Sequence, residues 1–188
     1  EFYIFEGEHV TVGSVFFESS SGSLSVPQET LLSLISLRTG ADYNPQNLEA
    51  DTQTLTEFYQ ALGYLYVVLN DPVTEVSGTR VSIKHLINEG IQVKISSIRL
   101  KNNLSKTEAE ILNALNIRIG SPYNEIDISD ARRKIIELYN KNGHLDIKVS
   151  VERDIEGSSA AITFNISEGA AFVFGKTLIL QNEYTKNE

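Results

Sequence analysis

Gly40-Ala-Asp-Tyr43-Asn44-Pro45 and the segment that closes it, Tyr59-Gln-Ala-Leu-Gly63-Tyr64, decide the fold of this chain. The same order returns as Gly120-Ser-Pro-Tyr123-Asn124 and then Tyr139-Asn-Lys-Asn-Gly143-His144. Gly40, Tyr43, Tyr59 and Gly63 recur 80 residues later, as Gly120, Tyr123, Tyr139 and Gly143. Four landmarks in one register indicate a duplicated domain.

Each copy predicts a turn that leads into a helix. Asn44 followed by Pro45 is typical of an N-cap and a first helical residue, and Asn124 predicts a cap in the second copy. Apolar residues then recur on one helical face over about 45–62 and 125–141. Gly63 and Gly143 follow at the position where helices commonly end in a left-handed residue.

The flanking segments complete a repeated β-α-α-β-β order. In the first copy we expect strands over 10–17, 64–69 and 79–87, a short helix over 27–37, and a loop over 71–78. In the second copy we expect strands over 93–100, 144–151 and 160–166, and a first helix started by the capping box Ser105-Lys-Thr-Glu108. The predicted class is α+β, with two helices on one face of each small sheet.

The dipeptide Glu-Gly marks the predicted boundaries, at residues 6–7, 89–90 and 168–169. We therefore expect residues 1–7 to end a preceding repeat, 8–88 and 89–167 to be whole repeats, and 168–188 to begin a following one. Its first strand is expected over 170–180. Because a strand-like pattern starts at the first residue, we expect the segment to be part of a longer chain.

Composition excludes several classes of protein. The net charge is −9 over 188 residues, and residues 10–87 hold 8 acidic against 3 basic side chains. This balance argues against nucleic acid as a partner, which needs clustered Lys and Arg. The chain has no cysteine, which excludes disulfides and thiol chemistry. No apolar run is long enough to span a bilayer as a helix.

No catalytic array or phosphate-binding loop is visible, so we expect no enzyme and no cofactor. His9, His85 and His144 lack the spacing of metal ligands, and we expect no metal site. The basic run Arg132-Arg133-Lys134 is interpreted as a solvated helix face, with anionic lipid or a partner protein as the alternative.

The ordered set of motifs resembles the polypeptide-transport-associated (POTRA) family. The family pattern has Gly-x-x-Tyr before the second helix, Tyr-x-x-x-Gly-Tyr after it, and Glu-Gly at the end of the domain. The matching residues here are Gly40, Tyr43, Tyr59, Gly63, Tyr64, Gly120, Tyr123, Tyr139 and Gly143. His144 stands where the family has an aromatic Tyr, and Asn102-Asn103 where it often has Gly-Asn. The resemblance implies a three-stranded mixed sheet, covered by two antiparallel helices, in each tandem domain.

What the resemblance implies about function is a periplasmic arm of an outer-membrane protein assembly factor. Its partners would be unfolded outer-membrane proteins and accessory lipoproteins or scaffold proteins, and a C-terminal β-barrel outside this segment would attach it to the membrane. Two alternatives stay open: the arm of a two-partner secretion or chloroplast-import transporter, and a structural spacer that binds no client.

The implied strand order, 1-3-2, makes the second strand of each domain an edge. The unpaired backbone of an edge can accept an extended peptide as an additional strand. The candidate residues are Leu65, Val67 and Leu69 in the first domain, and Leu145, Ile147, Val149 and Val151 in the second. We favour the second edge because Pro72 limits the first. Since each backbone hydrogen bond contributes about 0.5–1.5 kcal/mol, binding should be weak and sequence-tolerant.

Overall fold

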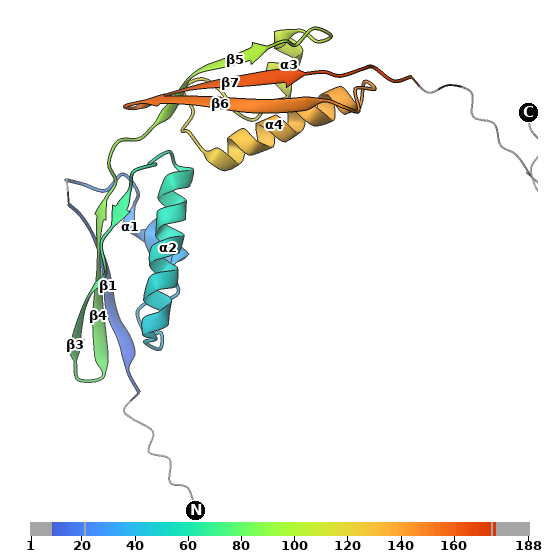
Figure 1. Cartoon of the computed structure of the whole chain (residues 1–188). Coiled ribbons are helices and arrows are strands. Elements are labelled where there is room, and N and C mark those ends of the chain that lie inside the picture. Colours follow the sequence, from blue (N-terminus) through green and yellow to red (C-terminus); the bar gives the residue numbers. More distant parts are fainter. Residues whose placement is uncertain (1–8, 21, 174, 176–188) are drawn as a thin grey trace, which may run out of the picture.

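The computed structural model describes residues 9–20, 22–173 and 175, and it shows two domains of the same design joined end to end (Figure 1). In each domain a small sheet carries two helices on one face, and the two domains are inclined to each other. The predicted α+β class with tandem β-α-α-β-β domains is confirmed.

The first domain is built around its last strand. It contains β1 (Thr11–Ser19), α1 (Gln28–Leu34), α2 (Pro45–Ala61), β2 (Val68–Leu69), β3 (Val73–Ser77) and β4 (Arg80–Asn88). β4 lies parallel to β1 on one side and antiparallel to β2 and β3 on the other. The sheet is therefore mixed, and β2 and β3 are two segments of one edge.

The second domain repeats this arrangement with β5 (Lys94–Lys101), α3 (Glu108–Ala114), α4 (Glu125–Asn140), β6 (Lys148–Glu156) and β7 (Ser159–Ser167). The strand order is β5-β7-β6, with β7 parallel to β5 and antiparallel to β6. A short hairpin joins β6 to β7, whereas the two helices connect β5 to β6, which lies on the far side of β7.

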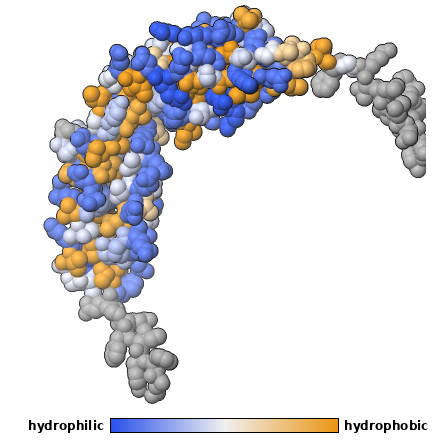
Figure 2. Space-filling model, viewed as in Figure 1, coloured by the Kyte–Doolittle hydropathy of each residue, from blue (hydrophilic) through white to orange (hydrophobic). Residues whose placement is uncertain are grey.

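Each domain has its own hydrophobic core between sheet and helices. Leu31, Leu55 and Tyr59 of the first domain are completely buried in a core that also contains residues of β1 and β4, and Ile111, Ile135 and Tyr139 are their counterparts in the second. These are the apolar positions of the amphipathic helices that the sequence predicts. On the outer surface, hydrophobic and hydrophilic side chains are mixed over the visible face (Figure 2).

The tyrosines of the repeated motif are packing residues. The rings of Tyr59 and Tyr64 meet edge to face with centroids 5.7 Å apart, and Tyr139 meets His144 in the same way at 5.6 Å. His144 therefore makes in the second domain the ring contact that Tyr64 makes in the first. Burial, together with the nearby carboxylates of Glu89 and Glu168, raises the pKa of the Tyr59 and Tyr139 phenols.

The Glu-Gly boundary motif has a structural function in both domains. Ser25 donates its backbone N–H and its hydroxyl to the Glu89 carboxylate, and Ser105 donates its backbone N–H to Glu168 at 2.9 Å. The end of each sheet thus holds the loop that precedes the first helix. For this reason the expected capping box at Ser105 is wrong: Thr107 is the N-cap, and Glu110 completes the box.

The second strand of each domain begins later than the sequence indicates. Residues 64–67 and 144–147 form a turn after the helix rather than a strand, because Tyr64 and His144 are bonded back to the carbonyls of Tyr59 and Tyr139. The expected loop over 71–78 is also wrong, since β3 occupies residues 73–77 and pairs with β4.

The joint between the domains is tight. The amide of Val93 donates to the carbonyl of Gly63 at 2.8 Å, and the Gln92 side chain donates to the carbonyl of Leu62 at 2.9 Å. Leu65 packs against the core of the second domain. Gly143 accepts from the Phe172 amide at 2.8 Å, so the same backbone contact recurs one repeat later.

Two predicted terminal features have different outcomes. The end of a preceding repeat at residues 1–7 lies outside the described residues. Residues 170–173 and 175 belong to no strand, and the rest of the strand expected over 170–180 is not among the described residues.

Candidate functional site

Among the described strands, β6 is an edge with an uninterrupted ladder, whereas the equally long edge strand β1 has a register shift between Val12 and Ser14 and is bonded near its start to residues 40 and 41. The β6 strand runs for nine residues without interruption, and β7 is its only neighbour among the described strands. The corresponding edge of the first domain is broken. There, residues 70–72 lie opposite only His85 and Leu86, which makes a one-residue bulge at Asn70-Asp71-Pro72. Of these two edges, that of β6 is therefore the more continuous.

The β6–β7 hairpin determines which backbone groups of β6 point outward. A two-residue turn at Gly157 and Ser158 makes Glu156 and Ser159 the closing hydrogen-bonded pair. In an antiparallel ladder, alternate residues direct their N–H and C=O groups to the neighbouring strand, and the others direct them away from it. The residues that face outward are Val149, Val151, Arg153 and Ile155.

The side chains of these outward-facing residues lie on the helix-covered side of the sheet. Val149 is buried, and Val151 and Ile155 are half-buried, whereas the alternating residues 150, 152 and 154 are exposed. A hollow beside Val149 is bordered by Ile147 and by Arg132 and Ile136 of α4. A strand added to β6 would therefore place alternate side chains toward α4.

Two arginines occupy carbonyls of this edge. Arg132 Nε of α4 donates to the Val149 carbonyl at 2.7 Å, and Arg153 Nη1 donates to the Val151 carbonyl at 3.1 Å. Arg153 is also paired with Glu125, whose carboxylate accepts from the Tyr123 hydroxyl. Burial and the Glu125 carboxylate raise the pKa of Tyr123 to about 12. No sequence pattern signals these contacts, because they join residues on different elements.

The predicted edge residues are distributed over several environments. Val149 and Val151 lie in β6, whereas Ile147 is buried in the turn before it, and Leu145 lies in the same turn with 65% of its surface exposed. In the first domain, Val67 and Leu65 precede the strand, and of the three candidates β2 contains Leu69. Leu65 contacts the second domain instead of an open edge.

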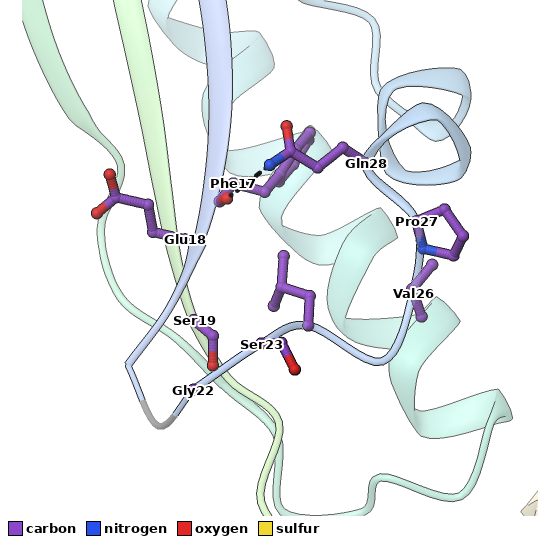
Figure 3. Close-up of a pocket in the computed structure, with 9 residues that line it drawn as sticks. Phe17, Glu18, Ser19, Gly22, Ser23, Val26, Pro27 and Gln28 are labelled. Carbon is purple, nitrogen blue, oxygen red and sulfur yellow. Dashed lines mark hydrogen bonds between the residues drawn. The ribbon is translucent and has the colours of Figure 1, made fainter.

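A second hollow lies at the end of β1, next to the serine-rich loop and the start of α1 (Figure 3). Gln28 reaches across it and donates to the Phe17 carbonyl at 3.3 Å. Its one titratable lining residue is Glu18, which pairs with Lys84 at 3.1 Å. This hollow therefore presents no group with reactive chemistry.

The histidines do not form a site. His85 is buried and stacks on Phe17 with ring centroids 5.3 Å apart, and burial lowers its pKa. Within the described ranges, no group of three or more His, Asp or Glu side chains is arranged to hold a metal ion. The helices described here are all too short or too polar to cross a membrane.

Comparison with known families agrees with this architecture. The family profile of POTRA, described as "Surface antigen variable number repeat", matches residues 10–90 and 93–169. The chain belongs to the POTRA family. The resemblance to tandem POTRA domains of an outer-membrane assembly factor is thereby confirmed.

Individual relatives point in the same direction. Outer membrane protein assembly factor BamA of Buchnera aphidicola is 26% identical over 97% of this chain and 31% of its own length. POTRA domains 3–5 of Haemophilus influenzae BamA superpose with a TM-score of 0.54 at 22% identity, covering 87% of this chain and 68% of that one. The N-terminal domain of Omp85 from Thermosynechococcus elongatus gives 0.55 at 18%, with 87% and 65% covered. The chain spans less than a third of the length of these curated BamA relatives.

Proposed function

We propose that this chain is the periplasmic POTRA region of an outer-membrane β-barrel assembly or translocation protein. In this proposal, extended segments of unfolded outer-membrane proteins and of accessory lipoproteins or scaffold proteins pair with the free edge of β6. Membrane attachment comes from a C-terminal β-barrel elsewhere in the protein. Support for the general role comes from membership of the POTRA family and from relatives named BamA.

The observation that carries the binding mode is the unbroken edge of β6. Four residues direct their backbone groups outward, and a groove bordered by Ile136 and Ile147 lies beside them. Added strands gain backbone hydrogen bonds of about 0.5–1.5 kcal/mol each, and ordering of the peptide offsets part of this gain. Affinity should therefore be modest and release fast, as a transient handling surface requires.

Chemical-shift mapping with a strand-forming peptide from an outer-membrane protein tests this binding mode. We expect perturbations at the amides of Val149, Val151, Arg153 and Ile155, and much smaller ones along β2 and β3. The matched control is the same peptide N-methylated at alternate residues. Methylation in one register removes the donors that face β6 and should abolish binding, whereas the opposite register keeps them. Equal binding of both methylated peptides would exclude strand addition.

The alternative of a spacer without client binding differs in one measurement. A client-binding arm slows aggregation of an unfolded outer-membrane protein when added in excess, whereas a spacer has no effect. The interrupted edge of the first domain, with its bulge at Pro72, is the feature that favours a spacing role for that domain.

A further inference from the structure

We propose that Arg132 is a latch on the β6 edge that selects extended segments carrying a carboxylate. The inference rests on the proposed function, and it names a chemical feature of the segment that the edge accepts. The partner is an extended chain with Asp or Glu on the side that faces α4.

The first step is that Arg132 occupies a group that an added strand needs. Its Nε donates to the Val149 carbonyl at 2.7 Å, and this carbonyl belongs to the outward-facing set of β6. The carbonyl oxygen has two lone pairs and Arg132 uses one of them, so the guanidinium competes with a client N–H for this acceptor, and in the proposed latch the client strand displaces it. The closed edge is protected from nonspecific pairing, which is a known use of charged residues on edge strands.

The second step is that the described part of the chain offers Arg132 no ion-pair partner. Among the described residues, no Asp or Glu lies within ion-pair distance of Arg132, and its Nη atoms have no protein acceptor. Its neighbour Arg133 differs, because it pairs with Asp130 at 2.8 Å and lies 3.9 Å from Glu137. Arg153 also remains bonded to Glu125 when it leaves Val151. Of the three arginines, a displaced Arg132 therefore gains most from a carboxylate supplied by the client; Lys148 also borders the hollow, but it belongs to the exposed alternating set of β6.

The third step concerns position. Arg132 is on α4 and borders the hollow beside Val149, so a displaced guanidinium stays on the helix-facing side of the edge. A client carboxylate reaches it from the face that carries the alternate side chains directed toward α4. The equivalent helix position in the first domain is Thr52, which donates to the Leu48 carbonyl of its own helix. The latch is thus a property of the second domain.

The test uses a pair of capped strand peptides that differ by one residue, Glu or Gln, placed on the α4-facing side. We expect the wild-type chain to bind the Glu peptide about fivefold more tightly, a typical effect for a partly exposed ion pair, with the preference decreasing at high salt. In Arg132→Gln the preference should disappear, while the Gln peptide binds at least as tightly as before. Arg133→Gln removes the same charge from the same helix and should keep the preference.

Each outcome supports or overturns the latch. Equal binding of both peptides to the wild-type chain, or equal loss of preference in the Arg132 and Arg133 variants, overturns the latch and leaves strand addition intact. If neither the Glu peptide nor the Gln peptide binds, both the latch and the proposed function are overturned. Should Arg132→Gln be poorly folded, Arg132→Lys retains the charge and should keep the preference. The salt dependence of the wild-type preference then tests the ion pair without a substitution, and a preference that high salt leaves unchanged overturns the latch.

Discussion

Replacing Gly63 by alanine tests the joint between the two domains. Gly63 has a φ of +89°, and a Cβ atom added there would lie 2.6 Å from the Val93 carbonyl oxygen, on the first segment of the second domain. Gly40 has nearly the same φ, +88°, but a Cβ atom there would meet nothing within 4 Å. The two glycines therefore differ in the space around them and not in their backbone conformation.

The magnitudes follow from this difference. An alanine forced into the left-handed region costs about 1–2 kcal/mol, and Gly40→Ala should show about that loss. Gly63→Ala adds the overlap with Val93, which as an overpacked contact costs about another 1–3 kcal/mol. It also strains the hydrogen bond from the Val93 amide to the Gly63 carbonyl.

The assay is urea denaturation, combined with amide hydrogen exchange at Val93. We expect Gly63→Ala to lower the free energy of unfolding more than Gly40→Ala does, and to speed exchange at Val93 specifically. The second repeat supplies a parallel pair, since a Cβ atom at Gly143 would overlap the Phe172 carbonyl and one at Gly120 would meet nothing. Equal losses for Gly40→Ala and Gly63→Ala, with unchanged exchange at Val93, would refute the idea of a sterically tight joint.

Three further changes probe the interior and the edge. Asp51→Asn should lower the free energy of unfolding of the first domain by about 2–3 kcal/mol in urea denaturation, because the buried carboxylate accepts from Ser36 N, Ser36 Oγ and Leu37 N. The control, Glu49→Gln at an exposed position of the same helix, should change that free energy by less than about 0.5 kcal/mol. Equal losses in the two variants would contradict a stabilising role of the buried carboxylate. Because burial lowers the pKa of His85 below its ordinary 6.5, the unfolded chain takes up a proton that the folded chain resists. The free energy of unfolding should therefore fall as the pH drops below 6.5. In thermal unfolding at pH 5–7, His85→Leu should reduce the dependence of the melting temperature on pH. The same dependence in both proteins would show that His85 is not responsible. Glu125→Gln should lower the pKa of Tyr123 from about 12 in an absorbance titration, since the Glu125 carboxylate contributes to raising this pKa. The free energy of unfolding should change by less than about 1 kcal/mol. An unchanged titration of the phenol would contradict the contact between Tyr123 and Glu125.

Local patterns were sufficient for the helices, because helix capping and apolar periodicity depend on residues close in sequence. Asn44 and Asn124 cap α2 and α4 as expected, and their side chains accept from Gln46 and Ile126. Errors occurred where a distant residue competes for a local group. The Glu168 carboxylate accepts a hydrogen bond from the Ser105 amide, and the helix cap is Thr107 instead. Residues 73–77 pair with β4 as a strand, although the local turn signals predict a loop there.

The candidate site shows the same division. Alternation along 147–151 identified the second edge as the more regular one, but it could not separate the turn from the strand or reveal what lies beside the edge. Arg132 belongs to a basic run that local charge patterning indicates to be a solvated face, yet its Nε is bonded to Val149, seventeen residues later.

The sequence by itself determined the duplication, the two helices of each repeat and the membership of the POTRA family, since these are recorded in spacing and periodicity along the chain. Tertiary structure alone decided which sheet edge is continuous, which of its carbonyls are covered and how Gly63 meets Val93. Those features depend on the register between strands and on contacts across domains, where a shift of one residue, as at Pro72, changes every partner along the edge.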